Sequence, residues 1–172
     1  MILKAIDLSL MSEHLMTHKG VLKKLAYYYC SVRNPLLKQT IYEQFLIMRN
    51  HVQVMLKLMD PQHNEDVSVL ALNQVELVDI PCPEPILRLG DKNILLEAHN
   101  TAKSMALDNF SSALKMKAPN VKSIHVQMAL QQVQLEERYS VLGEKIELNQ
   151  SPDTSAEEQI STIKQFEHLF HL

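Results

Sequence analysis

The chain has 172 residues, of which 46% are hydrophobic and 22% charged, and this is enough for one domain with a sizeable core. Its net charge of −3 at pH 7, spread without any cluster of Lys and Arg, excludes a general nucleic-acid binder. Only three glycines occur, while Leu, Met, Gln and Lys are plentiful, and this balance favours helix over sheet.

The two cysteines and the first residues bear on where the protein resides. Cys30 and Cys82 are too few for a disulfide framework and share no metal-ligand spacing, so we expect two reduced thiols in a cytosolic chain. Asp7 and Glu13 fall where a signal peptide needs an apolar run. No stretch of sequence reaches the roughly 18 apolar residues that span a bilayer. The sequence therefore predicts a soluble protein that is made and kept inside the cell.

The first third of the chain predicts a helical hairpin. Apolar residues recur every three or four positions over 3–33 and again over 35–59, which is the spacing of helices that pack along one side. Asn34-Pro35 separates the two helices, because a residue before proline avoids the helical region and proline suits a first helical turn. The predicted buried positions are Leu8, Met11, Leu15, His18, Leu22, Leu25, Tyr29 and Val32, followed by Ile41, Phe45, Met48, Val52, Met55 and Met59.

Residues 60–90 lose this rhythm and contain four prolines, at 61, 81, 83 and 85. About thirty residues is too long for a tight turn. We expect this segment to be a crossover that runs from one end of a helical bundle to the other.

A second hairpin follows. Asp91 is a plausible N-cap for a helix over 91–117, and Pro119 opens another helix over 119–147. The predicted buried side of the third helix contains Leu95, His99, Ala102, Ala106, Phe110 and Ala113, and its solvent side includes Glu97 and Thr101. The fourth helix has the stripe Val121, Met128, Gln132, Leu135, Tyr139, Leu142 and Ile146.

The tail over 148–172 is polar at first and then predicts a short closing helix. Ser155 and Glu158 have the spacing of a capping box. The amphipathic positions of that helix are Ile160, Ile163, Phe166 and Phe170.

The two hairpins look like an internal duplication. Pro35 and Pro119 are offset by 84 residues, and the same offset aligns Glu13 with Glu97, Lys19 with Lys103, and Lys38 with Lys122. Two hairpins joined by a long crossover predict an all-α, ferritin-like four-helix bundle, with a short C-terminal helix added to it. We expect residues 1–172 to form this single domain.

A ferritin-like bundle raises the hypothesis of a carboxylate-bridged di-iron site. That site takes one Glu from each of two helices and a Glu-x-x-His from each of the other two, all pointing inward. Glu13 and Glu97 look like the first pair, although both fall on the polar faces of their helices. The second pair fails, because the segments 48–51 and 132–135 begin with Met and Gln.

Inward histidines leave a second metal hypothesis open. His18 and His99 lie in the predicted stripes, Gln132 lies in the fourth, and His51 and His125 flank theirs with Glu136 near by. Imidazole suits zinc or iron. The alternative is a set of core histidines, each hydrogen-bonded to a neighbour. The remaining histidines are expected to be exposed: His14, His63, His168 and His171.

Other constellations point away from catalysis. The glycines lie too far apart for a phosphate-binding loop, and Arg33 gives only weak support to a reactive thiol at Cys30. We therefore expect a non-enzymatic protein without a cofactor.

One apolar strip is a candidate interaction surface. Leu46, Ile47 and Val54 lie away from the main stripe of the second helix. Either the crossover or the tail helix covers this strip, or it is a contact between subunits.

The first hairpin resembles the spore coat protein F family (Coat F domain). The resemblance rests on the run from Glu13 through Gly20-Val21-Leu22-Lys23-Lys24-Leu25 to Val32-Arg33-Asn34-Pro35-Leu36-Leu37-Lys38-Gln39, and it extends over roughly residues 8–147. It implies a ferritin-like bundle, a non-catalytic role associated with the spore coat, and no agreed active-site residues. The chain departs from many coat proteins in lacking a long Tyr- and Gly-rich tail.

The hypotheses can now be ordered. The first is a structural spore-coat protein that acts through packing and protein–protein contacts, with other coat proteins and further copies of itself as partners, and with synthesis in the cytoplasm. The alternative is a ferritin-like metal-binding protein or oxidase with a degenerate metal site. A small-molecule binder with a Met- and His-lined cavity comes last, since Met stripes are more often core.

Overall fold

The computed structural model describes residues 1–84, 89–145 and 152–170, and the described residues form helices without any strand. The helices are α1 (Ala5–Ser31), α2 (Pro35–Met59), α3 (Asp91–Lys115), α4 (Pro119–Lys145) and α5 (Ala156–Phe170), with a short 3₁₀ turn η1 (Leu72–Gln74) between α2 and α3. The ends of α1 to α4 lie within two residues of the predicted ends. None of the described helices combines the length and apolar character needed to cross a bilayer.

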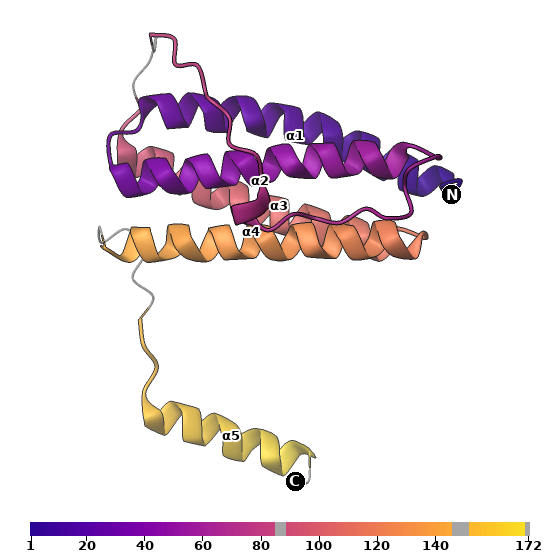
Figure 1. Cartoon of the computed structure of the whole chain (residues 1–172). Coiled ribbons are helices and arrows are strands. Elements are labelled where there is room, and N and C mark those ends of the chain that lie inside the picture. Colours follow the sequence, from indigo (N-terminus) through magenta and orange to yellow (C-terminus); the bar gives the residue numbers. More distant parts are fainter. Residues whose placement is uncertain (85–88, 146–151, 171–172) are drawn as a thin grey trace.

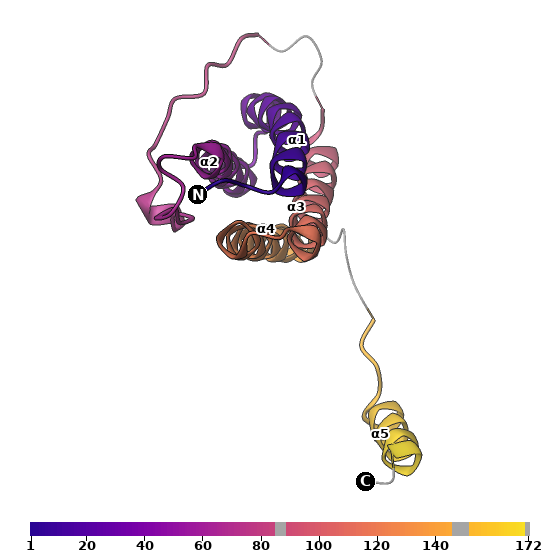
Figure 2. The same cartoon turned by 90° about the vertical axis from the view of Figure 1, so that its right-hand side faces the viewer.

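The helices α1 to α4 form a bundle made of two antiparallel hairpins (Figure 1). Seen end-on, they stand at the corners of a square in the order α1, α2, α4, α3 (Figure 2). The segment after α2 runs back along the bundle before α3 begins. The predicted fold, a ferritin-like four-helix bundle with a crossover, is confirmed.

Each hairpin turns on a proline at the first position of its second helix. In the first hairpin Asn34 is the N-cap of α2, and its side-chain Oδ1 accepts the backbone N–H groups of Leu36 at 3.0 Å and Leu37 at 3.1 Å. Pro35 has no N–H to satisfy, so it costs nothing at this position. Pro119 begins α4 in the same way.

A buried carboxylate near the start of α1 holds the turn between α3 and α4. Asp7 is fully buried. It accepts the backbone N–H of Lys117 at 2.7 Å and that of Ala118 at 3.1 Å, just before Pro119. A carboxylate that accepts two N–H groups satisfies donors that the following helix cannot pair internally.

The second repeat makes the same contact in the opposite direction. Asp91 accepts the backbone N–H of Arg33 at 3.0 Å and that of Asn34 at 2.7 Å, just before Pro35. Asp7 and Asp91 differ by the same 84 residues as the two prolines. The duplicated hairpins therefore tie each other's turns, one at each end of the bundle. Asp91 was predicted to be an N-cap, but Gly90 holds that position and Asp91 is the first helical residue.

The apolar core has two halves. One half contains Leu25, Ile41, Met48, Met105 and Leu135, and the other contains Met11, Met55, Met116 and Met128. Along each of the four helices, polar side chains lie between the two halves: His14 and His18, His51, Asn109 and Ser112, and His125. A polar layer thus crosses the bundle near its middle.

Two positions of α3 differ from the prediction. Phe110, predicted to be buried, is 50% exposed, while Thr101, predicted to face solvent, is buried. The helix is rotated relative to the predicted face, and Asn109 and Ser112 occupy the core side where an aromatic ring was expected.

The strip of Leu46, Ile47 and Val54 is buried and is not an exposed interaction surface. The crossover lies over this face of α2, where Val67, Val69 and Leu72 pack against the core. Three hydrogen bonds fix the path of the crossover. Tyr42 Oη donates to the Val78 carbonyl at 2.9 Å. The Leu70 N–H donates to Asn50 Oδ1 at 3.2 Å, and the Leu70 carbonyl accepts from Gln131 Nε2 at 2.8 Å. Of the explanations considered for this strip (the crossover, the tail helix or a subunit contact), the crossover is the one that the structure shows.

Helix α5 stands apart from the bundle (Figures 1 and 2). Its predicted capping box is confirmed, since Ser155 Oγ accepts the Glu158 N–H at 3.1 Å and the Glu158 carboxylate accepts the Ser155 N–H at 3.0 Å. None of its described residues is buried. Its apolar positions, Ile160, Ile163, Phe166, Leu169 and Phe170, are all at least half exposed.

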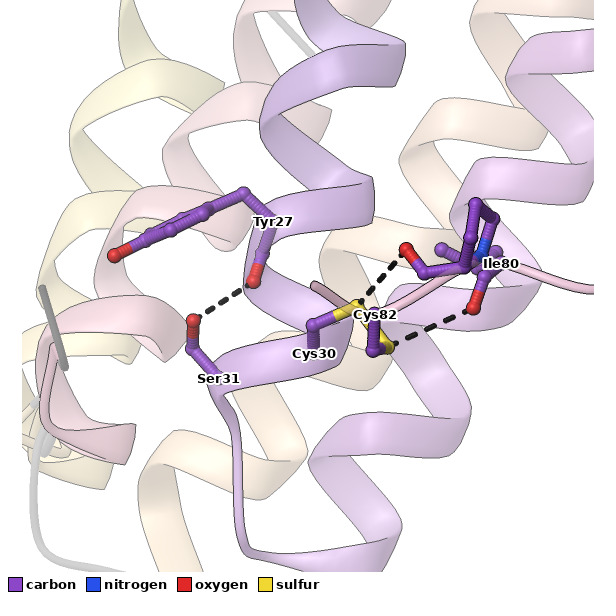
Figure 3. Close-up of a disulfide and its surroundings, with 6 residues drawn as sticks. Tyr27, Cys30, Ser31, Ile80 and Cys82 are labelled. Atoms are coloured by element: carbon purple, nitrogen blue, oxygen red, sulfur yellow. Dashed lines mark hydrogen bonds between the residues drawn. A yellow bond between two sulfur atoms is a disulfide. The ribbon is translucent and has the colours of Figure 1, made fainter. Parts of the chain in front are cut away.

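Cys30 and Cys82 form a disulfide, which corrects the expectation of two reduced thiols. Figure 3 shows the bond joining the last turn of α1 to the crossover, with Ser31 on the neighbouring position donating to the Tyr27 carbonyl. The Cα atoms of the two cysteines lie 5.3 Å apart. This contact could not be predicted from the spacing of the cysteines, because they meet only when the crossover returns along the bundle.

We predict that Asp7→Ala lowers the free energy of unfolding by about 3 kcal/mol, because each buried N–H left without a partner costs about 1–3 kcal/mol. Asp91→Ala should cost about 1 kcal/mol, since water can solvate the exposed N–H groups that it leaves. Urea denaturation measures both. Exposed Asp66→Ala is the control, and an equal loss for Asp66→Ala and Asp7→Ala would contradict the proposed role of the buried carboxylate.

We predict that the double variant Cys30→Ser, Cys82→Ser loses about 4 kcal/mol of stability by the chain-entropy argument for a loop of this length. The wild-type protein unfolded in reducing buffer should match the double variant. Native protein purified without reductant should show no thiol reactivity at these cysteines, and two reactive thiols would contradict the disulfide.

Candidate functional site

The polar layer of the core contains four histidines from three helices. His14 and His18 come from α1, His51 from α2 and His125 from α4. His18, His51 and His125 are fully buried, and His14 is 6% exposed. His14 was predicted to be exposed, and this prediction is wrong. Of the other histidines in that group, His63 and His168 are exposed and His171 lies outside the described residues.

The backbone fixes the tautomers of two of these rings. His18 Nδ1 lies 2.8 Å from the His14 carbonyl, and His125 Nδ1 lies 2.9 Å from the Val121 carbonyl. A carbonyl only accepts, so each Nδ1 carries the proton. The Nε2 atoms of both rings then hold lone pairs, and both are buried without a hydrogen-bond partner among the described residues.

An amide fixes the third ring. Gln131 donates from Nε2 to the Leu70 carbonyl, so its Oε1 faces the other way, 2.8 Å from His51 Nε2. His51 must donate from Nε2 to this oxygen, which leaves its Nδ1 with a lone pair. That atom too is buried and finds no partner in the part of the chain that the structure describes. The Leu70 carbonyl of the crossover thus orients the Gln131 amide on α4, and this amide sets the tautomer of His51 in the core.

His14 differs from the other three because both of its nitrogens have neighbours. Its Nε2 lies 2.8 Å from Ser112 Oγ. Asn109 donates from Nδ2 to the Met105 carbonyl and so presents Oδ1, and its side chain favours the protonated form of His14. His14 Nδ1 and Asn109 Oδ1 lie beyond full hydrogen-bond geometry, but each is the natural partner of the other. His14 is thus held by α3.

The rings lie close together and are neutral at pH 7. The centroid separations are 5.4 Å from His14 to His125, 5.8 Å from His18 to His51 and 6.1 Å from His14 to His18. Burial lowers the pKa of His18 to about 4 and that of His125 to about 4. Burial, assisted by His18, lowers the pKa of His51 to about 3. Burial also lowers the pKa of His14.

The candidate residues predicted from the sequence lie in several places. Of this set, His18, His51 and His125 belong to the buried cluster. Glu13 and Glu97 are exposed on α1 and α3 and lie outside the core. His99 is buried, but its Nε2 lies 2.7 Å from the Glu136 carboxylate at the edge of the bundle. The prediction named His125 among the inward histidines but missed His14, although the spacing of 14 and 18 with Met11 would have placed His14 on the buried face.

Gln132 belongs to a second buried set, and this set is satisfied. Gln44 donates from Nε2 to Gln132 Oε1 at 3.3 Å, Tyr139 donates to Gln44 Oε1 at 2.8 Å, and Gln132 Nε2 lies 3.3 Å from Met48 Sδ. Met48 and Gln132 are the positions where a di-iron protein would have its carboxylates. Their mutual contact, together with the exposure of Glu13 and Glu97, shows that these residues do not fit a carboxylate-bridged di-iron centre.

A groove leads from the surface to the histidine cluster. It lies between α1 and α3, has a volume of about 190 Å³, and reaches His14 and Ser112. Glu13 and Asp108 stand at its edge and favour a positive charge on His14. Across the described ranges, no three His, Cys, Asp or Glu side chains stand ready to hold a metal ion as the chain is folded here.

Comparisons with known proteins reveal a fold likeness. No protein-family model matches the sequence, and no curated protein is detectably similar to it. The crystal structure of a protein from Bacillus halodurans C-125, described as a putative spore coat protein, superposes with a TM-score of 0.69 at 14% sequence identity. The match covers 91% of this chain and 97% of that one. At this identity the likeness establishes the fold and no more, and the resemblance to the spore coat protein F family stays a resemblance.

Proposed function

We propose that this protein is a structural, non-catalytic component associated with the spore coat, which acts through packing and protein–protein contacts. The observation that carries this proposal is the likeness, over nearly the whole chain, to the Bacillus halodurans protein that is described as a putative spore coat protein. The resemblance of residues 8–147 to the spore coat protein F family points the same way.

Helix α5 is the element best suited to those contacts. It exposes Ile160, Ile163, Phe166 and Phe170 on a capped helix, and Phe166 and Phe170 stack with their ring centroids 6.4 Å apart. An apolar helical face of this kind gains stability when a partner covers it. Other coat proteins, or further copies of this chain, are the partners that the proposal implies.

The disulfide also suits a protein of the coat. Disulfides persist outside the reducing cytosol. The bond between Cys30 and Cys82 ties the crossover to α1 and so holds together a chain that must survive in an assembled layer. The proposal is therefore synthesis in the cytoplasm followed by incorporation into the coat.

The alternative of a ferritin-like oxidase has less support. The core lacks an acidic pair in the positions where such an enzyme bridges its two irons, and Glu13 and Glu97 lie on the surface. The lack of this acidic pair does not bear on the buried histidines, because they are not the ligands of such a centre.

The test is a fluorescent fusion of the full chain, followed by microscopy in sporulating cells of its host. We expect the fusion to gather at the developing spore, and an even spread through the cell would contradict the proposal. The double variant Ile163→Asp, Phe166→Asp should lose most of this localisation, because it places two charges on the apolar face of α5. Lys164→Ala, on the polar side of the same helix, is the matched control and should localise normally.

A further inference from the structure

The five buried side-chain atoms that lack a hydrogen-bond partner in the described structure all belong to the histidine layer: His14 Nδ1, His18 Nε2, His51 Nδ1, Asn109 Oδ1 and His125 Nε2. Buried polar atoms are nearly always paired, so a group of unpaired atoms at one place calls for an explanation. His14 and Asn109 face each other. Three imidazole lone pairs, on α1, α2 and α4, remain without any such neighbour.

We propose that His18 Nε2, His51 Nδ1 and His125 Nε2 bind one divalent transition-metal ion of the zinc class. Neutral imidazole nitrogen is a preferred ligand for such ions. Three protein ligands leave a fourth position for water in a tetrahedral site. This is a single-ion, all-nitrogen site, and it is distinct in ligand type from a carboxylate-bridged pair of irons.

The hydrogen bond made by the other nitrogen of each ring supports this assignment. A histidine that binds a metal almost always donates its other N–H to a carbonyl or carboxylate, which fixes the tautomer and the ring orientation. His18 donates to the His14 carbonyl, His125 to the Val121 carbonyl, and His51 to Gln131 Oε1. All three rings therefore have the tautomer that ligation requires.

The rings must move to close on an ion. With metal–nitrogen bonds of about 2.1 Å, the ring centroids of a tetrahedral site lie about 5 Å apart. His18 and His51 lie 5.8 Å apart, while His125 stands 5.4 Å from His14, which in turn lies 6.1 Å from His18. The proposal therefore requires side-chain rotations that bring the three nitrogens onto one ion. This explains why the metal-free arrangement does not form a finished site.

The groove between α1 and α3 approaches the layer as far as His14, and we include it in the proposal as the route of the ion. Glu13 and Asp108 in its lining attract cations, whereas Lys115 in the same lining repels them. In this proposal Glu13 attracts the ion to the groove and does not bind it as a ligand. His14 lines the route and stays bound to α3.

The test is a titration of the full-length, chelator-treated protein with Co²⁺, whose visible absorption bands report tetrahedral nitrogen coordination. We expect one equivalent to bind with such bands and to raise the melting temperature. His125→Gln removes one ligand with little change of volume and should weaken binding by more than about 100-fold, which exceeds the loss typical when only a hydrogen-bond partner of a ligand is removed. His63→Gln, on the surface and away from the layer, is the matched control and should bind as the wild-type protein does.

If His125→Gln fails to fold, the wild-type protein alone decides the matter. Paramagnetic shifts caused by Co²⁺ should appear in the NMR signals of the His18, His51 and His125 rings and leave those of His63 and His168 in place. Absence of the absorption bands, shifts confined to the exposed histidines, or unchanged binding by a folded His125→Gln would each overturn the proposal. In that event the three nitrogens are satisfied by buried water.

Discussion

The bundle depends on a pair of carboxylates that each repeat uses to hold the turn of the other. Asp7 binds the N–H groups before Pro119, and Asp91 binds those before Pro35. The two contacts fix the ends of all four helices relative to one another. Only with those ends fixed do the middles of α1, α2 and α4 meet in a constant register, and the histidines are located there.

This arrangement places a polar layer where a bundle of this size would gain stability from apolar packing. Burial of four imidazoles that are only half satisfied opposes folding, because a buried polar atom without a partner costs about 1–3 kcal/mol. The two apolar halves of the core and the disulfide between α1 and the crossover offset this cost. Such expensive groups are found where a protein uses them. The histidine layer therefore lowers the stability of the folded core. The exposed apolar face of α5 does not, because it lies outside the core and is available to a partner.

The sequence was informative about local structure and much less so about contacts between helices. Proline breaks, the capping box at Ser155 and the 84-residue repeat are local signals, and they predicted the helix ends closely. The pairing of Asp7 with α4 and of Cys30 with Cys82 depends on how distant segments meet, which a single sequence does not contain. The histidine layer lies between these cases. The buried face assumed for α1 was wrong by part of a turn, and so His14 was predicted to face solvent. In the structure the residues at positions 7, 11, 14, 18 and 25 form one buried stripe.

The central claim is that three core histidines present bare nitrogens whose tautomers the fold has already set. Long-range ¹H–¹⁵N NMR of the metal-free protein at pH 7 measures this directly. We expect neutral rings, with the proton on Nδ1 in His18 and His125 and on Nε2 in His51. A charged ring, or the opposite tautomer at any of the three positions, would contradict the account.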